Sequence, residues 1–97
     1  MYAVIFRATV GELDQQYSEE IERMKKLAFG EYGCLDFFAL AEGEERIAVS
    51  YWNSEEDIRN WKRNSEHLNA QEQGRERWYQ SYTVQVVEVR REYSHNR

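Results

Sequence analysis

The chain has 97 residues, which fits a single domain over residues 1–97, and a formal net charge of −5. This acidic balance argues against nucleic acid and membranes as partners, and the 14% of aromatic residues argues against disorder. Apolar runs such as Phe37–Ala41 are far too short to span a bilayer, and the N-terminus does not resemble a signal peptide. Because Cys34 is the only cysteine, no internal disulfide can form, and we expect a cytoplasmic protein.

The first half of the chain predicts strand, helix and hairpin in succession. Tyr2–Val10 is rich in β-branched and aromatic residues and predicts a strand. Tyr17–Phe29 carries apolar residues at helical spacing and predicts a helix, for which Gly30 is the expected stop. Leu35–Ala41 and Arg46–Trp52 then predict two strands joined by a short turn.

The second half predicts helical structure followed by a final strand. Ser54, three residues before Asp57, resembles a capping box and predicts that a helix starts at Glu55. We expect a second helical segment from Glu66 to about Tyr79, and a last strand over Tyr82–Arg91. The order β-α-β-β-α-β is that of the ferredoxin-like α+β fold, an antiparallel sheet with helices on one face.

Both faces of the predicted sheet carry large apolar residues. Phe37 and Phe38 are adjacent, as are Val86 and Val87, and adjacent residues in a strand point to opposite faces. The face without helices therefore needs a cover, and a second copy packed sheet to sheet is the simplest one. We expect a homodimer with two-fold symmetry.

The segment over residues 51–79 holds all three tryptophans and the only histidine outside the C-terminal tail. On a helix from Glu66 to Tyr79, four residues fall within about 60° of one another, namely His67, Gln71, Gly74 and Trp78. An ordinary core stripe would be aliphatic, and a glycine inside a helix costs about 1 kcal/mol relative to alanine. This stripe therefore favours a cavity wall, with His67 as a base or hydrogen-bond donor.

Other interpretations of these residues stay open. His67 could hold its helix in register through a hydrogen bond, and the tryptophans could be core anchors, which is the commoner role of such side chains. Tyr32, Tyr79 and Tyr82 could donate hydrogen bonds to a bound oxyanion. A single inward histidine does not predict a metal site, and no motif supports a nucleophilic pair between Cys34 and His67.

The pattern from Tyr51 to Arg91 resembles the antibiotic biosynthesis monooxygenase superfamily. The residues that carry the resemblance are Trp52, Ser54, Trp61, His67, Ala70, Gly74, Trp78 and Tyr79. The resemblance implies a dimeric α+β barrel in which each protomer has a pocket between its sheet and its helices. Some members of the superfamily oxygenate aromatic polyketides without metal or flavin, others degrade haem, and many have no known activity.

The resemblance implies a monooxygenase that needs no cofactor and acts on a small hydrophobic aromatic molecule of phenol or quinol type. His67 would be the catalytic base, and the substrate would contact Trp52, Trp61, Gln71, Gly74 and Trp78. One alternative is a non-catalytic dimer that binds a small ligand. Another is a haem-binding or haem-degrading protein, which is disfavoured because that branch has an Asn on the first strand and Tyr2–Val10 contains none.

Overall fold

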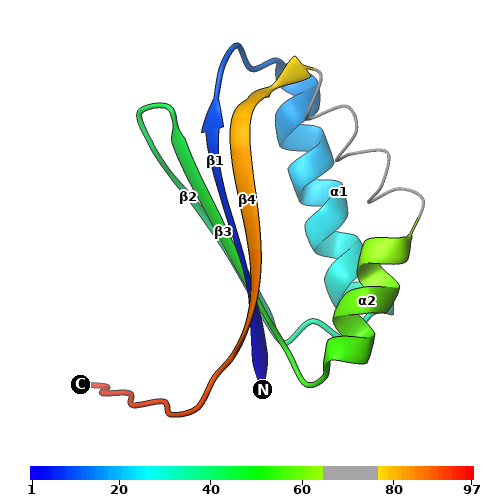
Figure 1. Ribbon diagram of the computed structural model, residues 1–97, viewed down its shortest axis with the longest axis vertical. Helices are drawn as coiled ribbons and strands as arrows, with labels where there is room; N and C mark the ends of the chain where they lie inside the picture. Colours follow the sequence, from blue (N-terminus) through cyan, green and yellow to red (C-terminus); the bar gives the residue numbers. More distant parts are fainter. Residues whose placement is uncertain (65–76) are drawn as a thin grey trace.

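Four antiparallel strands form one sheet in the order β2-β3-β1-β4, and the helices α1 and α2 pack on one of its faces (Figure 1). The computed structural model describes residues 1–64 and 77–97. Its elements are β1 (Tyr2–Val10), α1 (Gln15–Glu31), β2 (Asp36–Glu42), β3 (Glu45–Trp52), α2 (Glu55–Arg63) and β4 (Tyr79–Glu88). This arrangement confirms the predicted ferredoxin-like β-α-β-β-α-β order.

Strand β1 lies in the centre of the sheet and sets the register of both neighbours. Val4 pairs with Ser50 of β3 on one side and with Val86 of β4 on the other. Paired residues share a face, so the even-numbered positions of β1 point toward the helices. The core under the helices includes Val4, Met24, Ala28, Cys34, Trp52, Ile58 and Trp61.

Helix α1 is longer than predicted at both ends. Asp14 is its N-cap, with the side chain accepting a hydrogen bond from the Tyr17 backbone N–H at 3.2 Å. The expected stop at Gly30 is wrong, because the helix continues through it to Glu31. The chain reverses instead at Gly33, whose φ of +78° is readily adopted only by a residue without a Cβ.

Helix α2 begins where the capping pattern predicted. The Ser54 hydroxyl accepts a hydrogen bond from the Asp57 backbone N–H at 3.2 Å. Acidic residues occupy the first turn and Lys62 and Arg63 the last turn, so both ends complement the helix dipole. Ile58 and Trp61, three residues apart on one face of the helix, are buried.

Strand β4 occupies residues that the sequence assigned partly to a helix. It runs from Tyr79 to Glu88, so the expected helical end at Tyr79 and the expected strand Tyr82–Arg91 are both wrong in their bounds. An irregularity in the register at Thr9/Val10 brings Tyr79 opposite Val10 and so extends the strand at its start. At its C-terminal end, β4 stops where its neighbour β1 begins, at Tyr2. Just beyond this pair, Val89 N donates a hydrogen bond to Met1 O.

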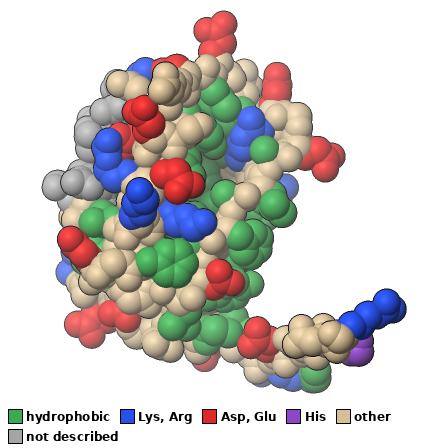
Figure 2. Space-filling model, turned by 180° about the vertical axis from the view of Figure 1, so that it is seen from behind, with side chains coloured by type: hydrophobic (Ala, Val, Ile, Leu, Met, Phe, Trp, Pro, Cys, Tyr) green, Lys and Arg blue, Asp and Glu red, His purple; other side chains and the backbone are tan. Residues whose placement is uncertain are grey.

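The face of the sheet opposite the helices carries exposed apolar residues. Phe38 is 40% exposed and Leu40 is 63% exposed, whereas neighbouring Phe37 points to the helix side. Val87 lies on the same open face as Phe38, because both alternate with residues that face the helices. Seen from behind, hydrophobic side chains form a band along the margin of the molecule where the sheet lies (Figure 2).

Among the described residues, no helix is both long enough and apolar enough to cross a membrane.

Candidate functional site

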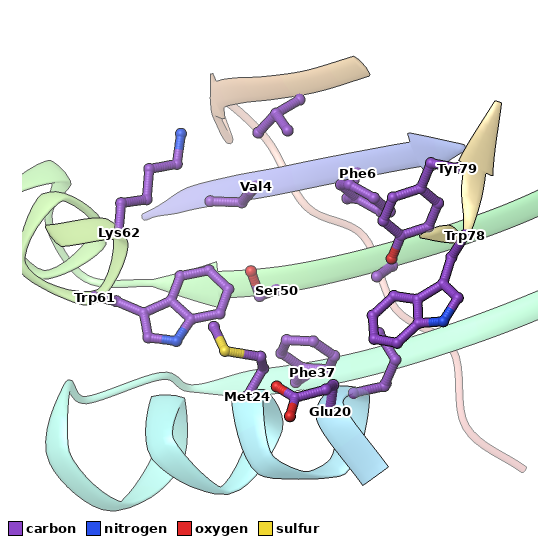
Figure 3. A pocket seen from close by; sticks show the side chains of 13 residues that line it. Val4, Phe6, Glu20, Met24, Phe37, Ser50, Trp61, Lys62, Trp78 and Tyr79 are labelled. Carbon is purple, nitrogen blue, oxygen red and sulfur yellow. The ribbon is translucent and has the colours of Figure 1, made fainter. Parts of the chain in front are cut away.

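A cavity of about 100 Å³ lies between the sheet and the two helices. The sheet contributes Val4, Phe6, Phe37, Ser50 and other side chains, and the helices contribute Met24 of α1 and Trp61 of α2, among others (Figure 3). Each of these strand residues points to the helix side of its strand by the alternation that places Val4 opposite Ser50. The lining is mostly apolar, as expected of a site for an uncharged organic ligand.

Two tryptophans close the cavity at opposite ends (Figure 3). Trp61 is 6% exposed and meets the Phe37 ring edge to face, with ring centroids 6.4 Å apart. Trp78 is 2% exposed and meets Tyr17 in the same way at 5.5 Å. Both indoles are therefore fixed by aromatic contacts, which favour this edge-to-face geometry.

Trp52 lies in the core behind Trp61. It is fully buried, its ring centroid is 5.1 Å from that of Trp61, and its Nε1 donates a hydrogen bond to Ser50 Oγ at 2.9 Å. The described residues that line the cavity do not include Trp52. Contact between Trp52 and a substrate stays a prediction. In the structure, Trp52 packs against the Trp61 indole and supports it.

The indole of Trp78 is held by the N-terminus of α1. Its Nε1 donates a hydrogen bond to Asp14 Oδ1 at 3.1 Å, and Asp14 also forms an ion pair with Arg77. The Arg77 guanidinium carbon lies 5.4 Å from the Trp78 ring centroid, in a cation–π contact. Arg77 thus contacts both the Asp14 carboxylate and the Trp78 ring.

Four of the described lining residues have polar side chains: Glu20, Ser50, Lys62 and Tyr79. The Ser50 hydroxyl accepts the Trp52 hydrogen bond, and Lys62 is half-buried at the α2 end of the cavity. Glu20 projects from α1 beside Met24, one helical turn away (Figure 3). Its side chain is only 12% exposed and forms an ion pair with Arg23 at 2.6 Å.

Tyr79 is the one of the three candidate tyrosines that lines this cavity. Burial raises the pKa of its hydroxyl above the ordinary value of 10.0, and the nearby Tyr17 adds to the increase. The phenol therefore keeps its proton at neutral pH. The hydroxyl of Tyr32 accepts a hydrogen bond from Asn64 Nδ2 at 3.0 Å, and Tyr82 stacks on Phe6 with centroids 5.7 Å apart.

A second hollow of about 250 Å³ lies between α1 and the β2–β3 hairpin. It shares Phe6, Ile21 and Ala48 with the first cavity. The two spaces are therefore adjacent, and a ligand held between Trp61 and Trp78 has room to extend toward the hairpin.

Three residues of the predicted site, His67, Gln71 and Gly74, lie outside the described residues. The structure thus brings together Trp61 and Trp78 and adds residues that the sequence did not single out, above all Phe6, Phe37 and Glu20. Phe6 and Phe37 were recognisable only as apolar strand residues. Glu20 gave no signal, because a charged residue beside a helical apolar stripe usually faces solvent.

Cys34 is buried, and its Sγ donates a hydrogen bond to Asp36 O at 3.1 Å. Burial raises the pKa of this thiol, so it is protonated at neutral pH and poorly suited to act as a nucleophile. Within residues 1–64 and 77–97, no three or more His, Cys, Asp or Glu side chains gather in a way that could hold a metal ion.

Solved structures share this fold. The chain superposes with a TM-score of 0.82 on a mutant form of SnoaB, a cofactor-independent oxygenase from Streptomyces nogalater, covering 97% of both chains at 13% sequence identity. It superposes equally well, with a TM-score of 0.82, on Rv0793 from Mycobacterium tuberculosis, covering 96% of this chain and 98% of the other at 20% identity. These similarities define the chain as a ferredoxin-like α+β protein.

Sequence comparison gives the family. The family model described as antibiotic biosynthesis monooxygenase matches residues 1–73, so the chain belongs to the antibiotic biosynthesis monooxygenase family. A relative from Bacillus subtilis (strain 168), the uncharacterized protein YqjZ, is 44% identical over 92 residues. That alignment covers 94% of this chain and 81% of the relative.

Proposed function

We propose that this protein binds a small hydrophobic aromatic molecule of phenol or quinol type and oxygenates it with dioxygen, without a cofactor. The observation that carries the proposal is the apolar cavity closed at its two ends by the Trp61 and Trp78 indoles. Membership of the monooxygenase family and the fold shared with a cofactor-independent oxygenase support the reaction type.

The cavity and the adjoining hollow together offer enough space for an aromatic ligand of one or two rings. A cavity of roughly 150 Å³ lined by aliphatic and aromatic side chains can hold benzene, and this cavity measures about 100 Å³ next to a hollow of about 250 Å³. Aromatic walls contact a flat ring over a large area and favour edge-to-face and offset-stacked arrangements. The predicted contacts with Trp52, Gln71 and Gly74 form part of the same proposal.

The proposed reaction balances with dioxygen as the oxidant. A phenol with a free C–H position loses two hydrogens and gains one oxygen atom to give a quinone, and the second oxygen atom leaves as water. His67 would take the phenolic proton, and the electron-rich anion would pass electrons to dioxygen. The buried, mostly apolar lining would exclude bulk water from the anion and its reactive products.

Oxygen uptake tests this proposal. We expect phenol- or quinol-type substrates to cause oxygen consumption that His67→Ala abolishes while the protein stays folded. Trp61→Ala should weaken binding of the substrate, and His95→Ala, in the C-terminal tail, is the matched control for the loss of an imidazole. Binding without oxygen consumption would instead identify a non-catalytic ligand-binding protein, and unfolding of His67→Ala would indicate a structural histidine.

We also infer that two copies of this chain associate through the open face of the sheet. The exposure of Phe38 and Leu40 on that face supports this, because such a concentration of large apolar side chains is typical of a protein interface. Each copy would keep its own cavity on the opposite side of the sheet.

A further inference from the structure

Glu20 is the only carboxylate among the described residues that line the cavity. It comes from the second turn of α1 and points toward the space between Trp61 and Trp78 (Figure 3). Its side chain is 12% exposed, so the carboxylate is largely removed from water. A charged group in such a place is costly unless a partner compensates for it.

Arg23 supplies only part of this compensation. Its Nη1 lies 2.6 Å from Glu20 Oε1, but the Arg23 side chain is 51% exposed, so solvent weakens the attraction. An ionised carboxylate has about four lone-pair positions for hydrogen bonds, and within the described part of the chain the ion pair with Arg23 uses a single oxygen. The remaining capacity is available to a ligand that carries an O–H or N–H group.

We propose that Glu20 is a specificity-determining residue of the cavity, which accepts a hydrogen bond from a ring hydroxyl and disfavours aromatic ligands that bear a carboxylate. This inference rests on the proposed function, since it assumes that the cavity binds an aromatic molecule. A hydroxyl donor satisfies the carboxylate, whereas a second anion nearby repels it with little solvent screening. Lys62 is the one cationic lining residue in the described part of the chain, and it could favour the opposite choice.

Glu20 is not proposed as the base that removes the phenolic proton. A carboxylate is a much weaker base than the phenolate that would form, so it suits a hydrogen bond from the hydroxyl better than removal of its proton. Glu20 would therefore orient the hydroxyl and select the ligand.

Titration calorimetry at pH 7 with 2-naphthol and 2-naphthoate tests the inference, since the two probes differ mainly in the charge of one substituent. We expect the wild-type protein to bind 2-naphthol more tightly, and Glu20→Gln to reduce the ratio of the two affinities by about tenfold or more, as hydrogen bonds to charged groups do. Glu19→Gln should leave the ratio unchanged, because Glu19 is exposed on the same helix and does not line the cavity.

Arg23→Gln is a second variant that keeps the inference testable if Glu20→Gln does not fold. It removes the cation beside Glu20, so the preference for 2-naphthol should increase. A ratio that Glu20→Gln leaves unchanged, or that Arg23→Gln lowers, would overturn the inference, and so would a wild-type preference for 2-naphthoate.

The outcomes separate this inference from the proposed function. If the ratio shifts as expected but no substrate causes oxygen uptake, the inference stands and the oxygenase proposal fails. If oxygen uptake occurs and the ratio does not respond to Glu20→Gln, only the inference fails. If neither probe binds to the wild-type protein, the cavity is not an aromatic site and both are overturned.

Discussion

The Trp78 indole donates a hydrogen bond to Asp14 Oδ1 at 3.1 Å, although the two residues are 64 positions apart in the chain. Asp14 is also the N-cap of α1, so a single carboxylate both starts the helix and holds one end of the cavity. The cavity wall and the helix start are therefore coupled through one side chain.

This coupling predicts that Asp14→Ala lowers the free energy of unfolding by about 2 kcal/mol, through loss of the cap and of the acceptor for Trp78. Asp14→Asn keeps a capping oxygen and loses only the ion pair with Arg77, which is largely exposed and is worth about 0–1 kcal/mol. Urea denaturation of the two variants checks the prediction. Equal losses for both would mean that the charge, and not the acceptor, is what stabilises this contact.

The hydrogen bond from Trp52 Nε1 to Ser50 Oγ is buried at both ends. Ser50→Ala leaves the indole N–H without this acceptor, and we expect a loss of about 1–3 kcal/mol in the free energy of unfolding. In a Trp52→Phe background the same change should cost much less, because the donor is already gone. Denaturation curves of the wild-type protein, the two single variants and the double variant give the coupling free energy between Ser50 and Trp52. Ser81→Ala, at an exposed position of β4, is the control.

The raised pKa of Tyr79 predicts a loss of stability in alkali. The folded protein holds this proton more tightly than the unfolded chain does, whose tyrosine has a pKa near 10. The stabilisation is therefore fully present below about pH 10 and decreases as the pH rises above it. Denaturation between pH 8 and pH 11 should show a steeper decline for the wild-type protein than for Tyr79→Phe.

Tyr93→Phe is the matched control for this titration, because Tyr93 is 86% exposed in the C-terminal tail. Removal of the Tyr93 hydroxyl should leave the pH dependence of the free energy of unfolding unchanged. If the free energy of unfolding of Tyr79→Phe declines as steeply with pH as that of the wild-type protein, other groups cause the effect.

The open face of the sheet predicts the oligomeric state. Light scattering at micromolar concentration should give twice the mass of one chain, and the double variant Phe38→Lys, Leu40→Lys should give the mass of one. Leu13→Lys changes an apolar residue that is 37% exposed in the connection between β1 and α1, outside the strands of the sheet, and should remain dimeric. A monomeric wild-type protein would overturn the proposed association.

Much of the fold could be predicted because its signals are local. The Tyr2–Val10 strand was predicted with its observed bounds, and the Ser54 cap fixed the start of α2. The start of β4 could not be predicted in this way, because Tyr79 joins the strand only through its partner Val10 across the sheet. Helical spacing alone carried the expected helix too far.

The candidate site was less accessible to sequence reasoning. Tryptophans stand out by their rarity, and Trp61 and Trp78 do line a cavity, while Trp52, chosen on the same ground, packs behind Trp61. Glu20 could not be found, since whether a helical carboxylate faces solvent or a cavity depends on where the sheet lies. The side of the helix that meets the sheet is set by tertiary packing, which local sequence patterns do not show.

The contact between Trp52 and Trp61 also gives the molecule an optical property. Two indoles with centroids 5.1 Å apart and planes inclined by 35° are close enough for their electronic transitions to couple. One of the pair is sealed in the core and the other faces the cavity. A ligand that touches Trp61 would alter the near-ultraviolet circular dichroism of the pair, so occupancy could be followed on the unlabelled protein.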